Sequence, residues 1–253
     1  MITLATAEKA LKEVYLDVVS DQLNTTVNPL LARLEKTARD VYGNNINKLV
    51  PYGLSGGIGA GSEDGDLPKA MGNKYARFTA SLKNLYGTIE ITDKAIRASS
   101  NNEGAFVNLL TAEMEGLLKA SRINLGRMLY GDGSGKLADI ASNTENTLIV
   151  IDAQYLTPGM IVDIYSDAVC SASGRQILSV TEKSDGTFSV TIDGTTLSTL
   201  TGTSIGIYLQ NSYQNEITGL GAIFSSTGSL YGISKSSNSW LIPYSSDIDG
   251  SLS

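Results

Sequence analysis

The sequence predicts an α+β fold built from a helical N-terminal arm, an extended β-hairpin loop, a long helix and an inserted small antiparallel β-barrel or sandwich. Three observations support this: a helical period across residues 100–131, a glycine-rich stretch between alternating segments, and a series of short β-rich runs across 147–210. With 253 residues the chain can bury a sizeable core, and we expect two domains.

Residues 1–43 are predicted to form the helical arm. One face of residues 3–23 is apolar, and its members are Leu11, Val14, Tyr15, Val18, Val19 and Leu23. Pro29, at a first helical position, starts a second helix that runs through Val41 and ends at Gly43. Two helices on a shared core, or a helix that packs on a partner, would both explain this pattern.

Residues 44–95 are predicted to form the extended loop, a protruding two-stranded β-ribbon. Its middle, Leu49 to Gly72, is too rich in glycine for a packed element, and Lys74 to Ile91 alternates as a strand does. Because a single exposed hairpin is marginal in water, we expect the ribbon to lie against a neighbouring subunit. The candidate contact residues between subunits are Tyr52, Leu54, Ile58, Leu67, Lys69, Tyr75, Phe78 and Leu82.

Residues 96–152 are assigned to the region around a long helix, predicted over 101–129. Its apolar stripe consists of Phe106, Leu110, Met114, Leu117, Leu125 and Met128. Ser100, Asn101 and Asn102 are candidate caps, and Gly131 provides a left-handed stop.

Residues 153–210 are predicted to be an inserted β-domain, because short β-rich runs follow one another with turns, such as Ala172-Ser173-Gly174, and no helix between them. Asp185-Gly186 is the strongest hairpin signal. Cys170 falls in a segment that looks like a loop, with no basic residue nearby to activate it. Residues 211–253 return to the first domain, with Trp240 as a core or interface anchor.

Composition argues against catalysis. The chain has no histidine, which removes the commonest general base and the Ser-His-Asp and Cys-His arrangements. Its net charge of -7 disfavours a grip on nucleic acid, and no apolar run is long enough to span a bilayer. We therefore expect no catalytic residues, no cofactor and no metal.

Two glycine or acidic motifs do not change that expectation. The GDGSGK segment at 131–136 has Tyr130 where a phosphate loop needs its first glycine and Leu137 where it needs Ser or Thr. Glu63, Asp64 and Asp66 lack the ligand order of a calcium loop.

The order of these segments resembles a known family. The segments that carry the likeness are the arm, the glycine-rich loop, the ribbon, the helix ending in GRMLYGDGSG (126–135), the β insertion, EITGLGAIF (216–224) and NSWLIP (238–243). Together they resemble the major capsid proteins of tailed bacteriophages with the Hong Kong 97-type fold, over most of residues 28–140 and 206–243.

The resemblance implies a subunit that self-assembles into pentamers and hexamers of an icosahedral head shell. The shell would form in the bacterial host cytoplasm, become part of the virion and enclose double-stranded DNA without specific binding. Scaffold, portal and decoration proteins are the implied further partners. Helix 101–129 would be the spine of the peripheral domain. By the resemblance, residues 211–253 return to the peripheral domain and begin the axial domain; because family members usually continue well past NSWLIP, the sequence would be either a fragment or an unusually short chain.

Two alternatives remain at this stage. An encapsulin-like nanocompartment shell would share the fold and store enzymes instead of a genome. A surface- or carbohydrate-binding β module centred on residues 147–210 would belong to a different functional class.

Overall fold

The structure is a computed structural model that describes residues 29–34, 41–54, 56–90, 92 and 103–244. The chain divides into two compact units, one of residues 1–130 with 223–253 and one of residues 131–222, and each is described by itself. The predicted helix over residues 3–23 and the caps Ser100, Asn101 and Asn102 lie outside the described residues.

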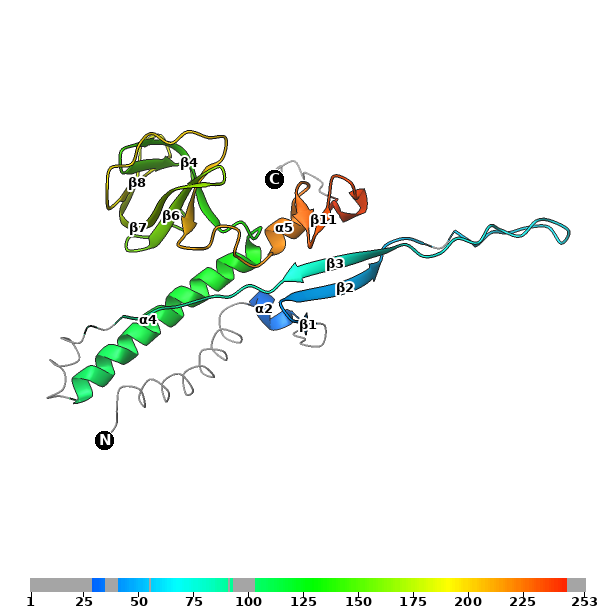
Figure 1. Ribbon diagram of the computed structural model, residues 1–253, viewed down its shortest axis with the longest axis horizontal. Helices are drawn as coiled ribbons and strands as arrows, with labels where there is room; N and C mark the ends of the chain where they lie inside the picture. Colours follow the sequence, from blue (N-terminus) through cyan, green and yellow to red (C-terminus); the bar gives the residue numbers. More distant parts are fainter. Residues whose placement is uncertain (1–28, 35–40, 55, 91, 93–102, 245–253) are drawn as a thin grey trace, which may run out of the picture. The chain divides into compact units, whose positions relative to one another are not determined.

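The second unit is a closed antiparallel barrel (Figure 1). Its strands follow the order β4-β5-β8-β7-β6-β9 around the barrel, and every neighbouring pair is antiparallel. The strands are β4 (Lys136–Thr144), β5 (Thr147–Val150), β6 (Ile161–Ser166), β7 (Val169–Glu182), β8 (Phe188–Ile192) and β9 (Ile205–Leu209).

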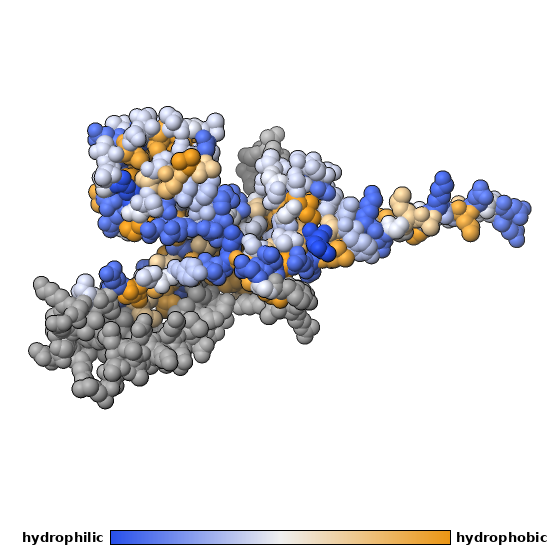
Figure 2. Space-filling model, viewed as in Figure 1, coloured by the Kyte–Doolittle hydropathy of each residue, from blue (hydrophilic) through white to orange (hydrophobic). Residues whose placement is uncertain are grey.

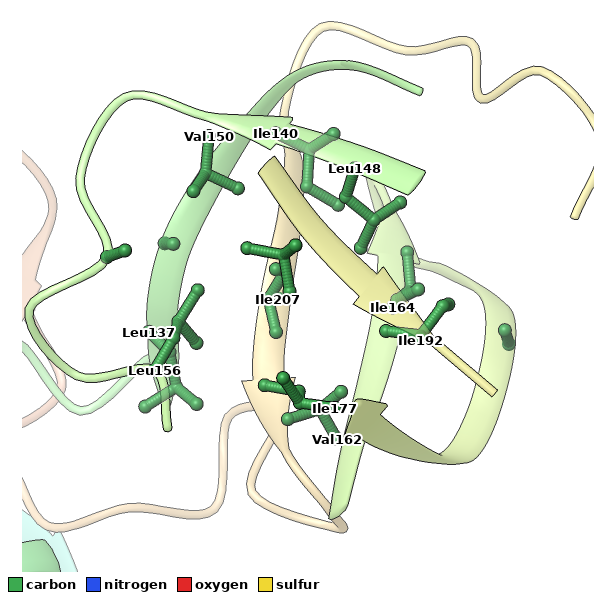
Figure 3. Packing of buried hydrophobic residues seen from close by; sticks show 14 of the residues in the cluster. Leu137, Ile140, Leu148, Val150, Leu156, Val162, Ile164, Ile177, Ile192 and Ile207 are labelled. Carbon is green, nitrogen blue, oxygen red and sulfur yellow. The ribbon is translucent and has the colours of Figure 1, made fainter. Parts of the chain in front are cut away.

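The barrel interior is filled by branched aliphatic side chains (Figure 3). β-Branched residues fit the pleated, inward face of a strand, and they dominate this core. Eight residues of this core are at most 1% exposed: Leu148, Val150, Val162, Ile164, Ile177, Val190, Ile192 and Ile207. Ile140 represents β4 in the same cluster, so all six strands contribute to it and the barrel has a core of its own.

The β7–β8 hairpin confirms the predicted turn at Asp185-Gly186. Gly186 has φ 79°, a left-handed conformation that glycine adopts at little cost. The Asp185 carboxylate accepts hydrogen bonds from the Thr187 N–H (3.0 Å) and hydroxyl (2.6 Å), and these bonds lower the Asp185 pKa. The side chain of Asp185 thus fixes the turn.

Strand β7 corrects two predictions. The stretch Ala172-Ser173-Gly174, expected to be a turn, lies inside the strand, and so does Cys170, expected in a loop. The pairing of β6 with β7 shifts register between Val162 and Ile164, and Gly174 has φ 65° there. A glycine at a β-bulge therefore gave the sequence signal of a turn.

Asp163 on β6 holds this bulge together. The side chain is 2% exposed, and its Oδ1 accepts hydrogen bonds from the Ser173 hydroxyl (2.7 Å) and the Gly174 N–H (2.8 Å). Its Oδ2 accepts a third from the Asn211 N–H at 2.8 Å. A buried carboxylate is tolerated when donors surround it in this way.

The barrel begins earlier than residue 153. Strands β4 and β5, which the sequence reading placed in the region 96–152, close the barrel by pairing with β9 and β8. The segment that precedes β4 and the segment that follows β9 also meet, since the Gln214 N–H donates to the Ser134 carbonyl at 2.8 Å. The change from helical to strand periodicity comes directly after Tyr130, which is where the unit begins.

The first unit contains the predicted ribbon. Strands β2 (Asn45–Pro51) and β3 (Tyr75–Ser81) pair antiparallel along their whole lengths, so the alternation predicted for β3 is confirmed. The strand predicted as far as Ile91 ends earlier, since residues 82–90 form no strand. In Figure 1 the ribbon continues beyond the strands into a long, narrow extension.

The region before the ribbon also differs from the prediction. Helix α2 (Pro29–Arg33) begins at Pro29, as predicted. Val41, however, belongs to the short strand β1 (Val41–Tyr42), which pairs with β2, and not to a helix that ends at Gly43. Val41 is β-branched, which favours a strand. Its pairing with Ile46 adds β1 to the edge of the ribbon.

Helix α4 (Glu103–Tyr130) occupies the position of the predicted long helix. Met128 on its predicted stripe is buried, whereas Met114, Leu117 and Leu125 are only half-buried. Phe106 and Leu110 fall among the side chains that are not described. The glycines with positive φ after the helix are Gly133 and Gly135, and Gly131 is not one of them.

The C-terminal part of the first unit is short and irregular. It comprises α5 (Leu220–Phe224), which crosses the boundary between the units, the hairpin β10 (Ser229–Leu230) and β11 (Ile233–Ser234), and a 3-10 helix, η1 (Ser239–Leu241).

The predicted fold class is wrong. The described strands belong mostly to a closed barrel, and the Hong Kong 97-type arrangement is not shown. Helix α4 in particular is not a spine packed along a sheet, since none of the described strands or helices lies extensively against it. The resemblance rested on the order of segments along the sequence, which does not specify how the strands pair, and β4 pairs with β5 and β9 in the barrel.

Candidate interaction surface

The extension beyond β2 and β3 exposes large apolar side chains. Leu54 is 95% exposed, Ile58 89% and Leu67 90%. Figure 2 shows hydrophobic residues along this extension, interspersed with hydrophilic ones. Single exposed apolar residues are ordinary on protein surfaces, but three nearly bare ones on one loop indicate a binding surface.

The remaining predicted contact residues lie on or beside the ribbon. Lys69 is exposed, as are Tyr52 (40%), Tyr75 (55%) and Leu82 (41%). The exposure of Lys69, Tyr75 and Leu82 leaves them available to a partner, and the role of all these residues in subunit contacts stays a prediction. Phe78 is half-buried, and both it and Tyr52 contact aromatic residues of their own chain.

The base of the ribbon carries an aromatic cluster formed by Tyr52, Phe78, Tyr231 and Trp240. Trp240 stacks on Tyr52 with ring centroids 4.5 Å apart and planes at 11°, and its ring meets that of Phe78 edge-on at 6.3 Å. Tyr231 meets Phe78 edge-on at 6.0 Å. Trp240 is thus an anchor within the first unit, and it uses two of the predicted contact residues.

Sequence reasoning missed further exposed apolar residues in this region. They are Leu49 (62%), Met71 (59%), Leu85 (43%) and Tyr86 (82%). Leu49 could have been found, since it occupies the same face of β2 as the polar Asn47 and so interrupts the alternation. The signal for Tyr86 was weaker, because it lies where no regular element forms.

The barrel carries a second aromatic cluster, formed by Tyr165, Tyr208 and Tyr213. Tyr165 and Tyr213 stack at 4.0 Å, and both meet Tyr208 edge-on. Burial, reinforced by the nearby Tyr213 and Asp139, raises the pKa of Tyr208 to about 12. Because Tyr165 and Tyr213 stack on each other, one face of each ring is occupied within the cluster.

Beside this cluster, Asp167 closes a loop of the barrel. Hydrogen bonds from the Ser204 N–H (2.9 Å) and from the hydroxyl and N–H of Thr203 hold its pKa below the usual carboxyl value. Asp167 itself has φ 54°, a conformation that aspartate tolerates better than most residues. These bonds give the carboxylate a structural task.

Neither a metal centre nor a membrane-spanning helix is found among the described residues. No group of three or more His, Cys, Asp or Glu residues there is placed to hold a metal ion. No helix in that part of the chain is long and apolar enough to cross a membrane.

No protein-family model, curated protein or solved structure matches this chain. The surface of the ribbon therefore has to be interpreted from its own geometry.

Proposed function

We propose that the chain is a major capsid protein, a structural subunit that self-assembles into an icosahedral shell enclosing a bacteriophage genome. The observation that carries the proposal is the ribbon, whose loop exposes Leu54, Ile58 and Leu67 almost completely. The proposal rests on this surface and on the family resemblance of the sequence, and not on a shared fold.

A second copy of the chain is the partner that fits the ribbon best. Burying the three side chains would contribute about 1.5–3 kcal/mol each, enough to favour association when repeated around a ring of subunits. The outer edge of β2 adds to this. β1 pairs only with Asn45 and Ile46, so at Leu49 the edge that faces away from β3 has no strand partner among the described residues. Exposed strand edges of this kind readily accept another chain.

The charge distribution is compatible with a container for DNA. Residues 131–222 contain ten acidic and three basic side chains, so the barrel unit accounts for the whole excess of negative charge. A surface of this sign does not neutralise phosphates, and the enclosed double-stranded DNA would be held without specific contacts. The proposed location is the virion, after assembly of pentamers and hexamers in the host cytoplasm.

The first experiment is to examine the purified full chain by electron microscopy and native mass spectrometry. Closed particles are expected, and a persistent monomer at high concentration would contradict the proposal. Particles that enclose protein in place of nucleic acid would instead favour an encapsulin-like compartment.

The second experiment tests the ribbon directly. Replacing Leu54, Ile58 and Leu67 together by serine should abolish closed particles while leaving the circular dichroism spectrum unchanged. A matched control replaces Glu63, Asp64 and Asp66 by serine in the same loop and should still assemble. Deleting Gly56 to Gly72 should act like the apolar triple variant; normal shells from that deletion would exclude a clamping role for the loop.

A further inference from the structure

The regular part of the ribbon ends at one defined position. Pairing of β2 with β3 runs from Asn45 to Pro51 on β2, and one further backbone hydrogen bond joins the Tyr52 N–H to the Lys74 carbonyl at 3.0 Å. Beyond it, described residues 53–54 and 56–73 belong to no strand, and within them the Gly65 N–H donates to the Ser62 carbonyl at 3.1 Å. Tyr52 thus lies directly after the last residue of β2.

Trp240 covers this last pair. Its ring lies flat on that of Tyr52, and the same ring contacts Phe78 farther along β3. The described residues 223–244 are called the C-terminal segment here. A backbone hydrogen bond also joins this segment to β3, from the Thr79 N–H to the Tyr231 carbonyl at 2.9 Å. The C-terminal segment therefore holds β3 at its edge and on one face.

The backbone around Tyr231 is shaped for this contact. Tyr231 has φ 48° and Gly232 φ 86°, the pair of left-handed conformations that a tight two-residue hairpin needs. A bulky residue is unusual at the first of these positions, and such an outlier persists where its surroundings fix it. Here the Tyr231 ring meets the Phe78 ring edge-on, and the Tyr231 carbonyl accepts a hydrogen bond from the Thr79 N–H.

The C-terminal segment is itself firmly anchored. Lys235 is fully buried, and its ammonium group donates to the carbonyl oxygens of Ile223 (3.0 Å) and Ser225. Its own N–H donates to the Gly228 carbonyl at 3.0 Å. Lysine is well suited to the carbonyls at a helix C-terminus, which here is the end of α5.

We propose that Trp240 and Tyr52 form a latch that locks the base of the ribbon to the C-terminal segment. The latch keeps β2 and β3 paired at the point where the regular part of the ribbon ends. It concerns the isolated chain and does not depend on shell assembly.

Limited trypsin digestion of the full chain tests the latch, because suitable cleavage sites lie on both sides of it. Arg77 lies within β3, Lys69 lies in the loop, and Lys119 lies in α4. Trp240→Ala should raise the cleavage rate after Arg77 at least about ten-fold, since proteolysis follows local opening. Cleavage after Lys69 and Lys119 should keep its wild-type rate.

A second variant and a control complete the test. Tyr52→Ala should accelerate cleavage after Arg77 and also shift the emission of Trp240, the only tryptophan, to longer wavelength. Tyr75→Ala removes an equally large exposed ring from the neighbouring pair and should change neither readout. The latch is refuted if Arg77 is cleaved at the wild-type rate in both variants, or if cleavage after Lys119 rises as much as that after Arg77.

Discussion

At the level of single residues, the barrel depends on a buried carboxylate. Asp163 satisfies three donors that belong to two distant parts of the chain, the bulge in β7 and the segment that leaves β9. No apolar residue could replace it without leaving the N–H groups of Gly174 and Asn211 unpaired. One side chain thereby stabilises both the bulge and the exit from the barrel.

Asp163→Asn should lower the free energy of unfolding of the barrel by about 1–3 kcal/mol, because an amide places an NH2 group against an N–H donor. The measurement is urea unfolding of the full chain, followed by the near-ultraviolet signal of the barrel tyrosines. Asp139→Asn is the matched control; it removes only an exposed ion pair with Lys136 and should cost a few tenths of a kcal/mol. Equal losses in the two variants would contradict the role given to Asp163.

At the level of elements, two glycines show how the same substitution takes opposite signs. An added Cβ would meet nothing within 4 Å at Gly116 in α4 or at Gly186 in the β7–β8 turn. Only backbone conformation then distinguishes them, since Gly186 has φ 79° whereas Gly116 is helical.

Gly116→Ala should stabilise α4 by about 0.5–1 kcal/mol, and Gly186→Ala should destabilise the hairpin by about 1–2 kcal/mol. Hydrogen exchange measured residue by residue reports the two elements separately within one protein. Slower exchange in β7 and β8 of Gly186→Ala would show that the turn is not left-handed in solution.

Local patterns predicted most elements but not their partners. Period-two alternation identified β3, short β-rich runs identified β5, β6, β8 and β9, and helical spacing identified α4, because these signals come from neighbours in sequence. The glycine of the bulge, Gly174, gave the signal of a turn. Val41 was assigned to a helix, because the local pattern did not reveal that it pairs with Ile46 in a strand. The exposed loop of the candidate surface followed from composition. The stacking of Trp240 on Tyr52 did not, since it joins residues far apart in the chain.

At the level of the whole molecule, the boundary of the barrel unit can be tested with fragments. Residues 131–222 expressed alone should fold and give a dispersed amide spectrum, because they contain all six strands and the core. Residues 153–210 alone should not, because they lack β4 and β5 and leave β8 and β9 with open edges. A dispersed spectrum from the shorter fragment would contradict the closed arrangement.

The seam between β4 and β9 also determines when the barrel can be completed. It joins Lys136 to Tyr208, so the first barrel strand to leave the ribosome pairs with the last one. Helix α4, whose hydrogen bonds connect residues four apart, can form well before that point. During synthesis the inward faces of β4 and β5 therefore stay open until β9 emerges, and this interval is when the nascent chain is most exposed to aggregation.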